Sequence, residues 1–142
     1  MSNERKYNKY VKVSNKLYLD LLLRKNDVFF QLVNGIYYIS DKHIVTVLQY
    51  KDLYINNERC KSARVKDILD SYRNKEYNVA YVGGTDDKKY IKLTDNIKNV
   101  LIDIKYYKIF ENFNFYISNI HSAVLVYDNT QLIGLIMPIK EY

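Results

Sequence analysis

The dipeptide Asn34-Gly35 constrains this chain more than any other feature, because it joins the apolar segments 28–33 and 36–40. A type I′ turn needs positive φ at both central residues, and Asn-Gly adopts this geometry readily. The pattern predicts a β-hairpin, followed by a turn at Asp41-Lys42 and a third strand over residues 44–49. The first third of the chain is therefore expected to form an antiparallel sheet.

The composition is typical of a folded protein. The 142 residues are 48% apolar and 27% charged, which favours one domain with a substantial core. No apolar run approaches the roughly 20 residues that span a bilayer, and residues 1–12 lack the apolar centre of a signal peptide. Cys60 is the single cysteine and forms no internal disulfide. These features favour a reducing, cytoplasmic location and predict no membrane partner.

The composition also argues against most catalytic sites. One Cys, two His and four Gly leave no Cys/His zinc cluster, Walker loop or Gly-rich dinucleotide turn. His43 and His121 would need a third ligand to form a metal site, so they are interpreted as turn residues. Cys60 lies between Arg59 and Lys61 and is interpreted as an incidental loop residue rather than a reactive thiol. The chain is therefore predicted to be non-enzymatic, with no cofactor and no metal.

The N-terminal segment is expected to contain the first of two capped helices. Residues 1–9 are interpreted as a basic lead-in and residues 10–13 as a short strand. Ser14 is a favourable N-cap, and apolar residues at helical spacing predict a helix over residues 15–24. The middle of the chain is expected to contain a polar loop at 51–61, a helix at 63–72, strands at 77–82 and 90–93, and a turn at 83–87.

Thr94 is expected to cap the second helix, which spans residues 94–106. Its apolar residues recur at the spacing of one helical face, at Ile97, Val100, Leu101 and Ile104. The chain is then predicted to finish as strands at 114–117, 123–127 and 132–139, with a turn at Asp128-Asn129. The last of these strands is a candidate edge that pairs across a two-fold axis, so a homo-oligomer is an open alternative.

The two expected helices belong to two similar halves. Residues 11–17 pair with residues 91–97 at an offset of 80, and residues 37–40 resemble residues 115–118 at an offset of 78. Each half, about 10–50 and 90–140, then contains a strand, a capped helix and three strands. Two such units can close a core that one helix on one small sheet cannot. The predicted fold is a single α+β domain over residues 10–142, built from these two repeats with antiparallel sheets.

This plan resembles one domain of a DNA sliding clamp, the processivity factor of replication. The closest similarity is to the end of bacterial beta clamps, which commonly finish in a Met-Pro-hydrophobic-Arg segment. In this chain the similar residues are 94–106, Phe115-Tyr116-Ile117-Ser118, 123–127 and 135–140. The resemblance implies a clamp-like domain. A bacterial clamp subunit has three such domains and this chain has room for one, which fits a reduced, single-domain relative from a phage or mobile element.

The resemblance also implies two binding sites. Clamp helices direct Lys and Arg at DNA phosphates, and the matching nucleic-acid-binding candidates are Lys12, Lys16, Arg24, Lys92, Lys98 and Lys105. Clamps receive short peptides near their C-terminal segment, where Met137 and Pro138 are the candidate partner-binding residues. The chain is therefore predicted to be an accessory that docks on DNA or on a host DNA-processing protein. The alternative is an anti-defence inhibitor of the anti-CRISPR type, which blocks a host nuclease or defence complex by direct binding.

The formal charge of +6 is consistent with a nucleic-acid partner but does not require one. Basic residues neutralise phosphates, and exposed tyrosines stack the bases of a single strand. The stacking candidates, which interleave with basic residues, are Tyr7, Tyr10, Tyr18, Tyr50 and Tyr54. A solvated surface without a nucleic-acid role is the alternative, and a small ligand bound at an oligomer interface is a further one.

Overall fold

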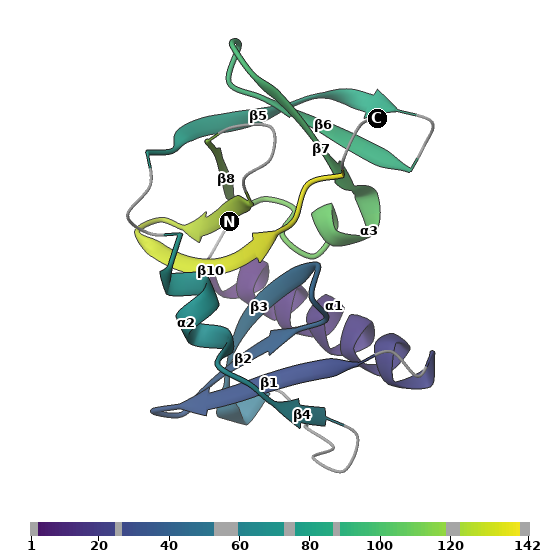
Figure 1. Cartoon of the computed structure of the whole chain (residues 1–142), viewed down its shortest axis with the longest axis vertical. Helices are drawn as coiled ribbons and strands as arrows, with labels where there is room; N and C mark the ends of the chain where they lie inside the picture. Colours follow the sequence, from purple (N-terminus) through teal and green to yellow (C-terminus); the bar gives the residue numbers. More distant parts are fainter. Residues whose placement is uncertain are drawn as a thin grey trace. The chain divides into compact units, whose positions relative to one another are not determined.

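The computed structural model divides the chain into two units, residues 1–71 and residues 72–142 (Figure 1). The part of the chain that it describes comprises residues 3–24, 27–52, 60–72, 76–86, 89–118 and 123–139. These residues form three α-helices, one 3₁₀ helix and ten β-strands, so the chain is a mixed α+β protein. Among them, no helix combines the length and the apolar character that a membrane span needs.

The first unit contains four strands in the order β4-β1-β2-β3. Its strands are β1 (Val28–Val33), β2 (Ile36–Ser40), β3 (Ile44–Gln49) and β4 (Cys60–Ser62). The first three form an antiparallel meander, and β4 lies parallel to β1. Asn34 and Gly35 have φ of 50° and 79°, as a type I′ turn requires. The predicted hairpin and the third strand are therefore confirmed.

Helix α1 (Asn3–Leu23) lies along one face of this sheet (Figure 1). Its bounds overturn three predictions, namely the lead-in over residues 1–9, the strand over residues 10–13 and the N-cap at Ser14. Residues 3–23 form one continuous helix, and a residue in a helix interior neither pairs as a strand nor caps a helix terminus. The helix predicted over residues 15–24 is the second half of α1.

The physical reason is an apolar stripe that extends further toward the N-terminus than the leucines indicate. Tyr10 lies 7 residues before Leu17 and 11 before Leu21, on the same helical face, and all three are buried. Ser14 falls on this face and is buried with them. A serine on the buried face of a helix has the same sequence pattern as an N-cap. The sequence therefore did not identify the first turns of α1 as helical.

The hydroxyl of Tyr10 joins α1 to β3. This side chain is 1% exposed, and its hydroxyl donates to the Val47 carbonyl oxygen at 2.9 Å and accepts from the Val47 N–H at 3.0 Å. Burial raises the pKa of Tyr10 above its ordinary value, which keeps the hydroxyl protonated and able to donate. One side chain therefore satisfies both backbone polar groups of a strand residue.

Helix α2 (Val65–Asp70) confirms, in shorter form, the helix predicted over residues 63–72. It packs against β1 and β2. Val65 and Leu69 are buried, as their spacing predicts, whereas Ile68, expected on the same face, is 52% exposed. The four-residue spacing of Val65 and Leu69 therefore defines the buried side of this helix.

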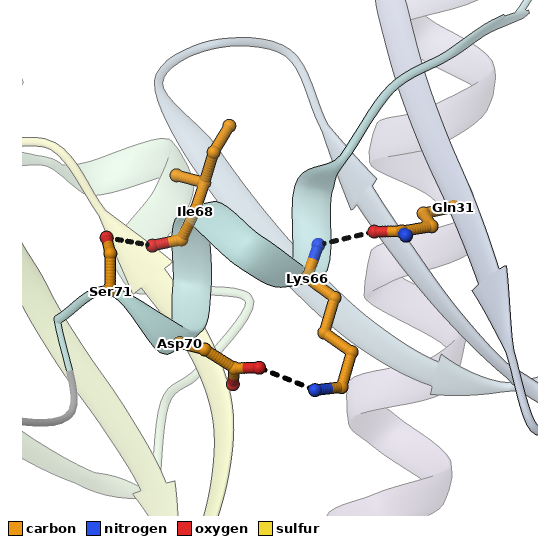
Figure 2. Close-up of polar contacts among 5 residues, drawn as sticks. All are labelled: Gln31, Lys66, Ile68, Asp70 and Ser71. Carbon is orange, nitrogen blue, oxygen red and sulfur yellow. Dashed lines mark hydrogen bonds and ion pairs between the residues drawn. The ribbon is translucent and has the colours of Figure 1, made fainter.

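Polar contacts hold both ends of α2 (Figure 2). The side-chain amide oxygen of Gln31, on β1, accepts from the Lys66 N–H at 2.8 Å and so satisfies a donor of the first helical turn. Lys66 and Asp70 form an ion pair four residues apart, at 2.5 Å. The Ser71 hydroxyl donates to the Ile68 carbonyl oxygen at 2.6 Å at the other end. These bonds tie the helix to the sheet and to the residue that follows it.

The second unit contains six strands in the order β10-β9-β8-β5-β6-β7, and all neighbours are antiparallel. The elements are β5 (Asn78–Asp86), β6 (Tyr90–Thr94), β7 (Asn99–Asp103), α3 (Ile104–Tyr107), β8 (Asn114–Ile117), β9 (Val124–Asp128) and β10 (Gln131–Ile136). Gly83 and Gly84, expected in a turn, lie inside β5 instead. The pairing register shifts there, as in a β-bulge, and Gly84 has a φ of 146° that favours glycine.

The helix predicted over residues 94–106 is wrong, because most of this segment is a turn followed by β7. The Asp95 carboxylate accepts from the N–H groups of Ile97 and Lys98 at 2.9 and 2.6 Å. The Thr94 hydroxyl accepts from the Asn96 N–H at 3.0 Å, and Asn96 has a φ of 73°. Thr and Asp make such short-range bonds in turns as well as at helix N-termini. The capping chemistry is therefore present, but it stabilises a hairpin turn.

The turn between β2 and β3 repeats this arrangement 54 residues earlier. The Ser40 hydroxyl accepts from the Lys42 N–H at 3.1 Å, and Lys42 has a φ of 81°. The Asp41 carboxylate accepts from the N–H groups two and three residues later, at 2.8 and 3.0 Å. A Ser/Thr-Asp pair followed by a residue with positive φ therefore forms both turns.

The 54-residue correspondence extends beyond the turns. Strand β2 pairs with β3 in the same register as β6 pairs with β7. The Tyr50 N–H donates to the Gly35 carbonyl at 2.7 Å, and the Ile104 N–H donates to the Lys89 carbonyl at 2.9 Å. The repeat predicted at an offset of 80 is wrong, because it aligns residues of α1 with β6 and the turn after it. The two halves share a β-meander rather than a capped helix.

Replacing Tyr10 with Phe deprives both backbone groups of Val47 of their hydroxyl partner. We expect the free energy of unfolding to fall by about 1–3 kcal/mol, the cost of leaving buried polar groups unsatisfied. Urea denaturation followed by circular dichroism measures this loss. Tyr81→Phe is the matched control, because Tyr81 is 64% exposed and its hydroxyl contributes within about 0.5 kcal/mol. Equal losses in the two variants would contradict the assigned role of the Tyr10 hydroxyl.

Candidate nucleic-acid interface

The solvent-facing side of α1 carries a line of cations. Arg5, Lys9, Lys12 and Lys16 follow at spacings of four, three and four residues, which places them on one helical face. We call these four residues the α1 stripe. All four are exposed, and the stripe is roughly 16 Å long at the rise of an α-helix. No Asp or Glu occurs between its first and last residue, so residues 5–16 themselves contribute only positive charge.

Contacts on the opposite face of α1 fix the rotation of the helix. Tyr10 is bonded to Val47 of β3, and the Tyr18 hydroxyl lies 3.2 Å from the Cys60 sulfur of β4. Cys60, expected in a polar loop, is therefore a buried strand residue. Because these two contacts reach strands at opposite ends of the order β4-β1-β2-β3, α1 cannot rotate without breaking them. The α1 stripe is consequently held toward solvent.

The 3₁₀ helix η1 (Tyr50–Asp52) lies along the flank of α1. The Tyr7 hydroxyl donates to the Asp52 carboxylate, and the Asn15 side-chain amide donates to the Asp52 carbonyl at 2.8 Å. Tyr7 and Asn15 are about two helical turns apart on one side of α1. Their contacts with a single residue fix η1 on one flank of α1.

Tyr50 presents an exposed aromatic ring on η1. Its ring stacks on that of Tyr37 in β2, with centroids 5.7 Å apart and planes at 22°. The Tyr50 backbone is held by its hydrogen bond to Gly35, yet the residue is 60% exposed. An open hollow of about 390 Å³ lies beside it, lined by Asn34, Gly35, Ile36, Gln49, Tyr50 and Lys51.

The other predicted stacking tyrosines do not form such a surface. Tyr10 and Tyr18 are buried in the core of the first unit, so their prediction as base-stacking residues is wrong. Tyr7 is half-buried and bonded to Asp52. Tyr54 lies outside the described residues. Among the candidates that the structure describes, Tyr50 is therefore the one whose ring is both exposed and supported by another ring, that of Tyr37. We call the Tyr50 ring and its support the platform.

Three of the six predicted nucleic-acid-binding cations lie on or next to α1 in the first unit. Lys12 and Lys16 belong to the α1 stripe, and Arg24 is exposed immediately after the end of α1. Arg5 and Lys9 were missed because residues 1–13 were not interpreted as helical. Counting back from Lys16 at helical spacing gives Lys12, Lys9 and Arg5, and this signal was available in the sequence.

The predicted cations of the second unit lie on three different elements. Lys92 is a half-buried residue of β6 whose Cε lies over Gly83, where an added Cβ would approach it to 3.0 Å. The Lys98 ammonium donates to the carbonyl oxygen of Ser118. Lys105, on α3, has its ammonium 4.8 Å from the centroid of its neighbour's ring, Tyr106. The predicted basic helix that would have gathered these lysines does not form.

The predicted partner-binding residues follow β10. Met137 and Pro138 are half-buried, and the next residue, Ile139, donates its N–H to the Leu101 carbonyl oxygen at 2.8 Å. The strand predicted over residues 132–139 ends at Ile136, because Pro138 has no N–H to contribute to a ladder. Protein docking at this segment stays a prediction.

The residues weighed for metal or acid–base chemistry are dispersed in the described part of the chain. His43 is exposed in the β2–β3 turn, and His121 lies outside the described residues. Among the residues that the structure describes, no group of three or more His, Cys, Asp or Glu could hold a metal ion. The candidate site consists of the exposed cations of the α1 stripe and the exposed ring of Tyr50.

Comparison of the chain with protein-family models, with curated proteins and with solved structures returns no match. The sliding-clamp resemblance consequently stays a prediction.

The contact between Tyr7 and Asp52 predicts a pH dependence of stability. Burial, and then the hydrogen bond to the carboxylate, raises the pKa of Tyr7 from 10.0 to about 12. The unfolded chain loses this proton first, so the stabilising contribution is complete below pH 10 and is lost as the pH rises toward 12. Urea unfolding at pH 8 to 11.5 should show a smaller alkaline loss in Tyr7→Phe than in the wild type. Tyr81→Phe, the exposed control, should follow the wild type, and identical profiles for all three proteins would contradict the assignment.

Proposed function

We propose that this chain is a non-enzymatic nucleic-acid-binding protein whose α1 stripe contacts phosphates. The observation that carries the proposal is the arrangement of four exposed cations on one face of a helix that is anchored on its other face. Residues 5–16 contain five basic and no acidic residues, which is an electrostatic footprint suited to a polyanion. Such a line of positive charge follows a phosphate backbone without requiring a particular sequence.

The entropy cost of binding is reduced because α1 holds the four cations in line before a ligand arrives. Neighbouring cations at three- and four-residue spacing lie about 5–6 Å apart at their Cβ atoms, and the helix holds this spacing before a ligand arrives. Lys12 and Lys16 form no ion pair within the described residues, so no described carboxylate competes with phosphates for them. Each phosphate neutralised releases counterions, and the affinity therefore falls steeply with salt.

Lys12 and Lys16 remain candidates for phosphate contact, whereas the second helix that a clamp-like ring would need is a β-hairpin in this chain. The proposed interface therefore lies on the first unit alone. It extends to Arg5 and Lys9, which the sequence prediction did not include.

A charge-matched pair of variants tests this proposal. We expect the variant Lys9→Gln, Lys12→Gln, Lys16→Gln to bind a labelled oligonucleotide more weakly than the wild type in fluorescence anisotropy at 50 to 200 mM salt. The slope of log affinity against log salt should become shallower by about 2, since each single-strand phosphate contact contributes about 0.7. Gln is a good helix former, so α1 should remain folded.

The control variant, Lys89→Gln, Lys105→Gln, Lys108→Gln, removes the same charge from three exposed lysines of the second unit. It should retain the affinity and salt slope of the wild type. Equal weakening of both variants would show that binding follows net charge and not the α1 stripe. Absence of oligonucleotide binding by the wild type at low salt would exclude the proposed function.

A further inference from the structure

We infer that Tyr50 stacks on a base of single-stranded nucleic acid while the α1 stripe and Lys51 contact its phosphates; this inference rests on the function proposed above. Tyr50 has the two properties that a stacking platform needs, a fixed ring and an accessible one. The ring is fixed by its stacking on Tyr37 at 5.7 Å and by the backbone hydrogen bond to Gly35. Its 60% exposure leaves it accessible to a ligand.

The support beneath Tyr50 continues into the sheet. Tyr37 is buried, and its ring contacts that of Phe30 at 6.3 Å in an edge-to-face arrangement. Three rings on η1, β2 and β1 therefore form one continuous aromatic column, with Tyr50 at the solvent end. A base that stacks there would meet a surface that does not have to be ordered first, which lowers the entropy cost of binding.

The hollow beside Tyr50 suits the edge of a base. Its volume of about 390 Å³ lies in the range of small-molecule sites. Asn34 and Gln49 are among the residues that line it, and both are exposed. An amide offers both a donor and an acceptor, so these side chains can bond different bases without selecting one. Lys51 lines the same hollow and supplies a positive charge for the adjoining phosphate.

The accessible ring of Tyr50 favours a single strand over a duplex. Asp52 is bonded to both Tyr7 and Asn15 of α1, so η1 is fixed against the helix that carries the α1 stripe. The Asp52 carboxylate is engaged by the Tyr7 hydroxyl, which directs this negative charge toward α1. In a duplex the base faces are covered by their neighbours, and a ring can stack only on a base that has been unstacked.

The second unit carries a different side chain at the position that corresponds to Tyr50 in the internal repeat. The residues that correspond to Tyr50 and Lys51 at the 54-residue offset are Ile104 and Lys105. The backbone bond to the preceding hairpin is conserved between the two sites, but the aromatic ring is replaced by an aliphatic side chain. The same backbone support therefore carries an aromatic ring in one unit and an aliphatic side chain in the other.

The experiment measures fluorescence anisotropy with labelled dT12, rU12 and a 12-base-pair DNA duplex at several salt concentrations. Tyr50→Leu should weaken single-strand binding by about 5- to 150-fold, the range for removing one stacked base, with the salt slope unchanged. Tyr50→Phe keeps the ring and should bind like the wild type. Duplex binding should be equal in all variants. Comparison of dT12 with rU12 shows whether the ligand is DNA, RNA or both.

Tyr81→Leu is the matched control, because this residue is a similarly exposed tyrosine outside the proposed surface. If Tyr50→Leu and Tyr81→Leu bind alike while the α1 stripe variant loses affinity, the stacking inference is wrong and the proposed function stands. If the wild type binds none of the three probes, both are wrong. Loss of binding in Tyr50→Phe as well as Tyr50→Leu would also overturn the stacking role, since the ring is retained.

Discussion

The first unit depends on one buried hydroxyl, that of Tyr10, which satisfies both the N–H and the carbonyl group of Val47. Backbone groups left unpaired in a core are costly, so this contact fixes the position of α1 against β3. The contact of Tyr18 with Cys60 fixes the same helix against β4. A helix held at two points on one face must present its other face to solvent, and the positive α1 stripe is the result.

A second constraint is the turn formed by a Ser/Thr-Asp pair and a residue with positive φ. Ser40-Asp41 and Thr94-Asp95 make the same backbone hydrogen bonds 54 residues apart. Both turns set the register of a hairpin, and each meander then ends in a short helical segment bonded back to the preceding hairpin. The two units differ in the side chain at the start of this helical segment. The first unit has an exposed aromatic ring on η1, and the second has an aliphatic residue at the start of α3.

Local rules predicted much of the sheet but less of the site. The Asn34-Gly35 hairpin was predictable because its geometry depends on two residues, whereas the apolar spacing of 97–104 fits a helix and also strand β7. Ile97 decides between them, since a helix would bury it and the hairpin leaves it 84% exposed. Lys12 and Lys16 were identified, but Arg5 and Lys9 required recognition of the full helix. The support of Tyr50 by Tyr37 is a tertiary contact that sequence spacing does not encode.

The most direct test of the account is to map oligonucleotide binding by NMR on the isotopically labelled full chain. Backbone amide shifts recorded during titration with dT12 should change most along residues 5–16 of α1 and at η1, and changes at residues 89–118 should be small. This result would locate the interface on the anchored helix and its flanking platform. Shifts concentrated in the second unit, or none in α1, would contradict the central claim that the outward face of α1 is a phosphate-binding surface.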